Sequence, residues 1–285
     1  MPTAYLNGHF VPLSEAHISP LDRGFLFGEG IYEVIPVYAG RPLGRQAHMQ
    51  RLHNSLARVA QPCPLSDAEL DAMLDGLIER NGGGDLSIYL QITRGVAHGV
   101  RNHAFPDAYT PTVFAMCQSL EPRSPQIAEH GVAAITLDDE RWAQCDIKST
   151  SLLANTLARQ EAREASAVEA ILLRAGEVTE GAASSVFVVR DGCVMQPPPA
   201  AGILPGTTAP LVETLLKKLG VASTSQAISE KALRNADELW LASSTREVLP
   251  VTTLDGKPVG AGVPGPLWQQ LDHLYQSAKR ATDHS

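Results

Sequence analysis

The chain has 285 residues, of which 44% are hydrophobic and 19% are charged, and its formal net charge at pH 7 is −8. This length and composition predict a globular protein with an ample core, built as one large domain or two modest ones. The acidic balance, in which no run of Lys or Arg exceeds the pair Lys217-Lys218, argues against nucleic-acid binding, and no apolar window is long enough to span a membrane.

The first part of the chain predicts a small domain of strands and helices. Asn7-Gly8 lies between two short apolar runs, which is a type I′ hairpin signal. Ser66 and Glu69 form a capping box that opens a helix. The apolar patterns predict strands over 31–38, 86–93 and 112–118, helices over 45–60 and 66–81, and a long loop over 94–111. Loops of that length are usually functional or disordered.

The rest of the chain alternates strands and helices. Residues 119–128 hold two prolines among charged residues and are the best candidate for a linker. We therefore expect a two-domain α+β/α/β protein, with a small N-terminal α/β domain over 1–118 and a larger C-terminal domain over 129–285. In the larger domain, strands are expected over 132–137, 168–173, 185–189 and 238–242, and helices over 151–165, 208–219 and around Leu267–Leu274.

The cysteines and the N-terminus indicate the compartment of the protein. Cys63, Cys117, Cys145 and Cys193 are isolated, in neither zinc nor redox spacing, and are predicted to be reduced thiols. The N-terminus has no basic segment followed by an apolar one. We expect a cytoplasmic protein without a metal site.

Lys148 lies in the segment between the strand 132–137 and the helix 151–165. Most lysines are surface residues, and a solvated loop lysine is the simplest interpretation. About thirty residues later, Glu180 follows Val178-Thr179 on a turn that leads into an apolar strand. A lysine that can form an imine and a carboxylate that can keep a pyridine nitrogen protonated are the pair that pyridoxal phosphate requires of its protein.

Two later turns would suit a phosphate. One is Ile203-Leu204-Pro205-Gly206-Thr207-Thr208, which precedes a helix, and the other is Leu241-Ala242-Ser243-Ser244-Thr245, which follows a strand. Backbone N–H groups and the dipole at a helix N-terminus favour an anion, and hydroxyl groups add donors. An ordinary N-cap would have the same residues.

The chain resembles the fold-type IV (class IV) pyridoxal-phosphate aminotransferases, and among them the D-amino acid aminotransferases. The likeness covers Tyr5 to about Asp255 and depends on several short motifs in the family's order. They are Asp22 to Glu33, His48 to Leu52, Thr93-Arg94-Gly95, Asp146-Ile147-Lys148-Ser149, Val178-Thr179-Glu180-Gly181 and Ile203 to Thr208. The resemblance implies a larger domain that is β-barrel-like and binds pyridoxal 5′-phosphate.

The resemblance also assigns roles in cofactor binding. Lys148 would be the Schiff-base and proton-transfer residue, and both roles need its amine in the neutral form. Glu180 would face the pyridine nitrogen. Arg51 is similar to the family's phosphate-binding arginine, although an exposed helix arginine is a rival interpretation. Thr207, Thr208, Ser243 and Ser244 would supply further phosphate contacts.

Substrate recognition is implied for Tyr32, Arg101 and His103. The last two resemble the Arg-x-His carboxylate trap of the D-amino acid aminotransferases, in which the tyrosine also takes part. In the family this loop reaches over from the other subunit, which implies a homodimer with shared active sites. A solvated loop of mixed charge and a packed strand tyrosine are the competing interpretations.

The expected reaction is transamination between a D-amino acid, D-alanine or D-glutamate, and a 2-oxo acid, pyruvate or 2-oxoglutarate. Branched-chain L-amino acid transamination, aminodeoxychorismate lyase activity and an inactive dimeric module that binds the cofactor are the alternatives. Two departures bear on the phosphate contacts and the substrate range. Ala209 stands where relatives usually have an arginine, and the turn Gly181-Ala182-Ala183 lacks a serine that is often found there.

Overall fold

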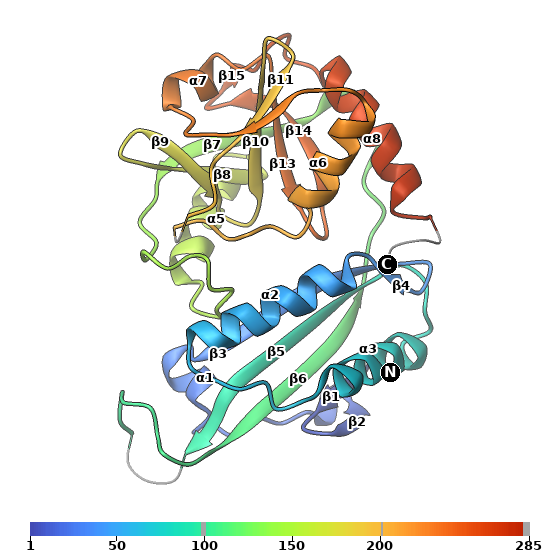
Figure 1. The fold of residues 1–285 in the computed structure, drawn as a ribbon, viewed down its shortest axis with the longest axis vertical. Coiled ribbons are helices and arrows are strands. Elements are labelled where there is room, and N and C mark those ends of the chain that lie inside the picture. The colour runs from blue at the N-terminus through green and yellow to red at the C-terminus, as the bar shows by residue number, and fades with distance from the viewer. Residues whose placement is uncertain (98–100, 201, 282–285) are drawn as a thin grey trace. The chain divides into compact units, whose positions relative to one another are not determined.

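The computed structural model describes residues 1–97, 101–200 and 202–281, and these residues form two compact units (Figure 1). Unit 1 contains Met1–Glu121 and the short segment Ile147–Ser151, and unit 2 contains Pro122–Asp146 and the described residues from Leu152 to Ala281. The boundary between the units, at Glu121 and Pro122, thus falls inside the expected linker 119–128. The five residues Ile147–Ser151 belong to unit 1 although they follow that boundary in the chain. The expected division at 118 and 129 stays a prediction. Within the described residues, no helix combines the length and apolar character that a membrane span requires.

Unit 1 is built on a six-stranded antiparallel sheet in the order β2-β1-β6-β5-β3-β4. Helices α2 and α3 pack on this sheet (Figure 1). Buried aliphatic side chains of Ile35, Leu52, Leu74 and Ile88 belong to one core between them. The strands are β1 (Thr3–Leu6), β2 (His9–Pro12), β3 (Gly30–Tyr38), β4 (Arg41–Pro42), β5 (Leu86–Ala97) and β6 (Tyr109–Ser119). The helices are η1 (Leu13–Glu15), α1 (Arg23–Phe27), α2 (Arg45–Arg58) and α3 (Asp67–Arg80).

Local sequence explains several of these elements. Asn7 and Gly8 both have positive φ, as a type I′ turn requires, and β1 and β2 pair across them. The capping box of α3 is present, because the Ser66 hydroxyl accepts from the Glu69 N–H and the Glu69 carboxylate accepts from the Ser66 N–H. The predicted loop 94–111 is shorter than expected, since β5 continues to Ala97 and β6 begins at Tyr109.

Unit 2 is built on a nine-stranded mixed sheet in the order β12-β11-β10-β13-β14-β7-β8-β9, with β15 paired to β14. The pairs β14–β7, β7–β8 and β11–β12 are parallel, and the other pairs are antiparallel. The strands are β7 (Val132–Asp138), β8 (Glu169–Arg174), β9 (Glu177–Gly181), β10 (Ser185–Arg190), β11 (Cys193–Gln196), β12 (Ser223–Ser225), β13 (Glu238–Ser243), β14 (Glu247–Leu254) and β15 (Lys257–Pro258). The helices are α4 (Pro125–His130), α5 (Leu153–Glu164), α6 (Ala209–Lys218), α7 (Glu230–Arg234) and α8 (Pro266–Ala278).

The parallel pairs of unit 2 follow from its helical crossovers, since α5 connects β7 to its parallel neighbour β8. The sheet core is continuous and aliphatic, with Ile171, Val188 and Leu239 fully buried or nearly so. One local expectation needs correction: Glu180 lies near the end of strand β9, not on a turn. Ala175 and Gly176 both have positive φ and form the tight turn that makes β8 and β9 a hairpin.

Candidate active site

Lys148 belongs to the short segment that returns to unit 1. The Tyr32 N–H donates to the Lys148 carbonyl at 3.0 Å, and Ile31 and Ser149 form an antiparallel bridge. The Lys148 N–H donates to the Ser55 hydroxyl of α2 at 3.2 Å. The segment is therefore held beside β3 by an isolated bridge and backbone hydrogen bonds, which fix the main chain of the lysine. Its Nζ lies 4.2 Å from the centre of the Tyr32 ring, which is a favourable site for an amine cation.

A buried carboxylate orients Arg51. Glu33, on β3, accepts from Nε and Nη2 of Arg51, both at 2.8 Å, and lies 2.7 Å from Nδ1 of His48. All three residues are buried. Burial alone would raise the pKa of Glu33, but the bonds to Arg51 and His48 lower that pKa to about 2. Burial lowers the pKa of His48, although the hydrogen bond to Glu33 and the charge of Glu33 act to raise that pKa. The guanidinium plane of Arg51 is thus fixed by an acid that is ionised at neutral pH.

The three residues expected to bind substrate carboxylate have different surroundings in unit 1. Tyr32 stacks on Tyr89, with ring centres 5.7 Å apart, and lies against the Lys148 amine. Arg101 and His103 instead flank the ring of Phe27, at 4.4 and 5.2 Å from its centre. The structure therefore places Tyr32 beside the Lys148 amine, and it places Arg101 and His103 against the same ring, that of Phe27.

In unit 2, Glu180 is held by Arg141, whose side chain is largely covered. Its Oε1 accepts from Nη1 of Arg141 at 2.5 Å and from the Leu204 N–H at 3.1 Å. Arg141 is itself fixed by Asp139, through Nε and Nη2 at 2.9 Å each. Burial raises the pKa of Glu180, and Arg141 only partly offsets this effect. Among the described residues, both hydrogen bonds of Glu180 end on Oε1, which leaves Oε2 for a ligand donor.

The two turns expected to hold a phosphate meet in unit 2. The hydroxyl oxygens of Thr207 and Ser244 are 3.3 Å apart. Thr208 is the N-cap of α6, and its side chain makes no capping hydrogen bond. Ser243 is the last residue of β13. Hydroxyl groups beside a helix N-terminus of this kind can bind an anion.

Sequence reasoning missed three residues that complete these arrangements. His48 opens one of the motifs named above and Arg141 lies five residues before another, but nothing local marks them as partners of Glu33 and Glu180. Glu33 is the last residue of the Asp22 to Glu33 motif, and the alternation along its strand points it inward. A charged residue inside an apolar strand was the signal available for Glu33. Among the described residues, no group of three or more His, Cys, Asp or Glu side chains could hold a metal ion.

Comparison with known proteins identifies the family. The family model described as amino-transferase class IV matches residues 30–254. The D-alanine aminotransferase of Bacillus licheniformis is 40% identical over 273 residues, which cover 95% of each chain. The D-alanine aminotransferase of Staphylococcus aureus strain MW2 is 38% identical over 277 residues, which cover 97% of each chain. These matches extend over nearly the whole sequence.

Solved structures show the same fold. A branched-chain amino acid aminotransferase from Escherichia coli has a TM-score of 0.89 at 26% identity, covering 100% of this chain and 97% of its own. Another branched-chain amino acid aminotransferase (T.th.), solved with pyridoxamine 5′-phosphate, also has a TM-score of 0.89, at 27% identity, covering 97% and 93%. The predicted two-domain fold and the predicted enzyme class are confirmed. The chain belongs to the class IV aminotransferase family.

Proposed function

We propose that this protein transfers the amino group of a D-amino acid, D-alanine or D-glutamate, to pyruvate or 2-oxoglutarate, with pyridoxal 5′-phosphate as cofactor. The observation that carries the proposal is that Glu180 is a buried carboxylate which Arg141 holds through one oxygen. The curated relatives named above are D-alanine aminotransferases. These relatives align with nearly the whole chain, which supports a D-amino acid as the substrate.

The cofactor, when bound, supplies an electron-withdrawing ring that stabilises the carbanion formed at the substrate α-carbon. Glu180 would keep the pyridine nitrogen protonated through Oε2, since Oε1 is committed to Arg141 and Leu204. A carboxylate whose pKa is raised by burial is stabilised by a cationic donor. Arg141 would hold Glu180 in position and favour its ionised form.

Lys148 would bond covalently to the cofactor aldehyde and, once released, carry a proton to and from the substrate carbon through Nζ. The backbone of Lys148 is fixed by β3 and Ser55, so only the side chain needs to move between the two tasks. The Tyr32 ring, 4.2 Å from Nζ, would limit where the amine can go.

The phosphate would be bound by Arg51 and by the hydroxyl groups of Thr207, Thr208, Ser243 and Ser244. The close approach of Thr207 and Ser244 supports this role for the two turns, and the ion pair with Glu33 gives the Arg51 guanidinium a fixed plane. Ala209, which replaces the usual arginine, lies at the first position of α6 and adds no charge.

The substrate carboxylate would be bound by Tyr32, Arg101 and His103, contributed by two copies of the chain in a homodimer. The separate surroundings of Tyr32 and of the Arg101 loop support a partner that supplies one of them. Large apolar side chains of unit 1 are exposed, with Leu21, Phe25 and Phe105 at 61%, 77% and 55%. Contact with a second copy of the chain would cover such exposed apolar side chains.

A second candidate function is transamination of branched-chain L-amino acids, because the solved structures of similar fold are enzymes of that kind. The deciding experiment offers D-alanine, D-glutamate, L-leucine and aminodeoxychorismate separately to the cofactor-loaded protein. Conversion of the bound cofactor to its amine form is followed by absorbance. We expect conversion by the two D-amino acids. Conversion by L-leucine but not D-alanine would contradict the proposal, and an absence of any cofactor band would indicate an inactive module.

A further inference from the structure

Unit 1 contains a second charged cluster, two buried arginines around the partly exposed Glu29, that the proposed reaction does not use. Arg23 donates from Nε and Nη2 to the two carboxylate oxygens of Glu29, at 2.6 and 2.8 Å. Nε of Arg94 lies 3.2 Å from the same carboxylate. Arg23 and Arg94 are only 4% and 2% exposed. Two buried guanidinium groups on one carboxylate need further acceptors for their remaining N–H groups.

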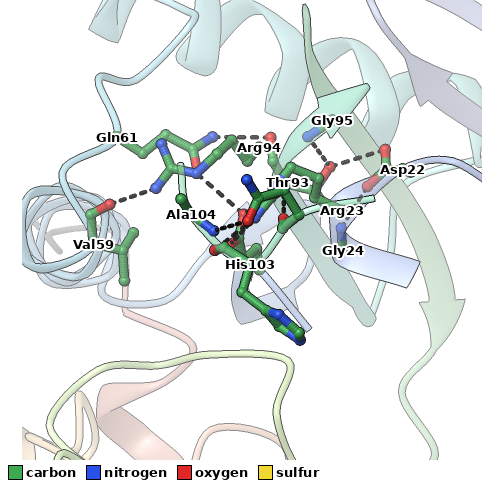
Figure 2. A network of polar contacts seen from close by, with 12 residues as sticks. Asp22, Arg23, Gly24, Val59, Gln61, Thr93, Arg94, Gly95, His103 and Ala104 are labelled. Atoms are coloured by element: carbon green, nitrogen blue, oxygen red, sulfur yellow. Dashed lines mark hydrogen bonds and ion pairs between the residues drawn. The ribbon is translucent and has the colours of Figure 1, made fainter. Parts of the chain in front are cut away.

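The main chain of the Arg101 loop supplies the acceptors for Arg23. Nη1 donates to the Asn102 carbonyl at 2.8 Å, and Nη2 donates to the His103 carbonyl at 3.2 Å. Figure 2 shows the His103 imidazole pointing away from the cluster while its main chain lies within it. Because the acceptors are backbone atoms, Arg23 fixes two successive peptide units of the loop. The Arg101 and His103 side chains take no part in these hydrogen bonds and are exposed.

Arg94 holds the next part of the same loop. Its guanidinium lies 3.8 Å from the ring centre of Phe105, and its Nη2 donates to the Val59 carbonyl at 2.6 Å. A β-bulge turns Arg94 inward, since the register between β5 and β6 shifts after Thr93. Gly95 has a φ of +72°, and a Cβ at this position would lie 1.8 Å from the Thr110 carbonyl oxygen. Only glycine can form this bulge.

Local contacts complete the fixation of the loop. The Asn102 side chain accepts from the Ala104 N–H at 3.1 Å, which forms an Asx turn. The Phe27 ring contacts Arg23 as well as the Arg101 and His103 side chains, with Cζ of Arg23 4.6 Å from its centre. The loop is therefore bound to α1 through both its backbone and its side chains.

We propose that Arg23, oriented by Glu29, is a positioning residue for substrate recognition, because it sets the backbone that directs Arg101 and His103. This inference rests on the proposed function, in which those two side chains bind the α-carboxylate. Arg23 itself would not touch the substrate. Its effect should appear in the affinity for carboxylates and not in the covalent chemistry at Lys148.

The test compares Arg23→Lys, which keeps the charge but loses the planar fork, with Glu29→Gln, which keeps the shape but loses the orienting charge. Both are measured as cofactor-loaded full-length proteins. In single-turnover reactions with D-alanine, the dissociation constant should rise about 10- to 100-fold in both variants, because a small displacement of a binding group is costly. Binding of acetate, followed through the cofactor absorbance, should weaken in the same proportion.

A readout independent of activity is deuterium uptake by the backbone of residues 101–108 in the cofactor-free protein, which should become faster in both variants. Arg80→Lys is the matched control, because Arg80 also lies over an aromatic ring, 4.1 Å from the centre of Phe10. It should behave like the parent protein. Arg101→Ala is the reference for direct loss of carboxylate binding.

The outcomes separate this inference from the proposed function. If Arg101→Ala weakens acetate and D-alanine binding but Arg23→Lys and Glu29→Gln do not, the positioning role is wrong and the proposed function stands. If Arg101→Ala has no effect either, the carboxylate site is wrong and the inference fails with it. Loss of the cofactor absorbance in parallel with carboxylate affinity would show that Arg23 supports the whole unit, which also contradicts the proposal.

Discussion

Two buried glutamates, one in each unit, are both paired with an arginine but have pKa values shifted in opposite directions. Glu33 receives two bonds from Arg51 and one contact from His48, and its pKa falls to about 2. Glu180 receives one bond from Arg141 and one from a backbone N–H, both at the same oxygen, and burial raises its pKa. The number of donors on a buried carboxylate decides whether the protein alone can stabilise its charge.

We infer that this difference separates a structural acid, Glu33, from an acid prepared for a ligand, Glu180. Glu33 is fully satisfied by its own unit, and its task is to orient Arg51. Among the described residues, Glu180 is hydrogen-bonded to one cation, Arg141, and a protonated pyridine nitrogen would supply another. The same residue type therefore serves two purposes, and the hydrogen bonds around each glutamate distinguish them.

The largest expected effect is on the reaction rate of Glu180→Gln. An amide cannot keep the ring nitrogen protonated, so the rate of the D-alanine half-reaction should fall by at least about 100-fold, as when a group that stabilises developing charge is lost. The measurement is a single-turnover rate at saturating D-alanine. A rate within a few-fold of the parent would show that Glu180 does not face the ring. Asp237→Asn, a surface substitution in unit 2, serves as the control.

The next effect is on the stability of Glu33→Gln. This change leaves the buried Arg51 without its counter-charge, and breaking a buried pair typically costs about 3 to 5 kcal/mol. Urea unfolding should show this loss, together with weaker cofactor binding. Glu180→Gln should destabilise the protein less, because the parent carboxylate is poorly compensated. Equal losses in the two variants would contradict the distinction drawn between the two acids.

The pH dependence of stability should also have opposite signs at the two sites. Because the folded-state pKa of Glu33 is lowered, its contribution is present above the ordinary value of 4.5 and is lost as the pH falls toward about 2. The folded-state pKa of Glu180 is raised, so its contribution is present below 4.5 and is lost as the pH rises through the folded value. The stability difference between the parent and each Gln variant, measured across this range in cofactor-free protein, should change in opposite directions. Changes of the same sign would contradict the assignment.

The smallest expected effect belongs to Thr207→Ala. Loss of one hydroxyl contact to phosphate should weaken cofactor binding by about threefold to tenfold, the usual value of one hydrogen bond. Titration of the cofactor-free protein with pyridoxal 5′-phosphate measures it. Thr214→Ala, whose hydroxyl donates to the Pro210 carbonyl within α6, is the control. An unchanged dissociation constant would remove Thr207 from the phosphate site.

The elements that depend on a few adjacent residues could be predicted from the sequence. Asn7-Gly8 forms its hairpin and Ser66 opens its helix, because each depends on a few adjacent residues. The motif order predicted the family and directed attention to Lys148 and Glu180. The turn at Ala175-Gly176 was missed, since alanine gives no signal for positive φ.

Contacts between distant residues could not be predicted. Arg141 lies 39 positions from Glu180, and Arg23 lies 79 positions from Asn102. The sequence marked Asp22-Arg23 and Thr93-Arg94-Gly95 as motifs, but their meeting depends on the β-bulge at Gly95 and on the pairing of β5 with β3 and β6. Those pairings arise from the whole sheet and not from any short segment.

The most direct test of the central claim is the identity of the residue that bonds to the cofactor. The protein is incubated with pyridoxal 5′-phosphate, reduced with borohydride and digested, and the modified peptide is sequenced by mass spectrometry. The account predicts one stoichiometric adduct on Lys148, which is absent from Lys148→Ala. A stoichiometric adduct on another lysine, or no adduct at all, would contradict it.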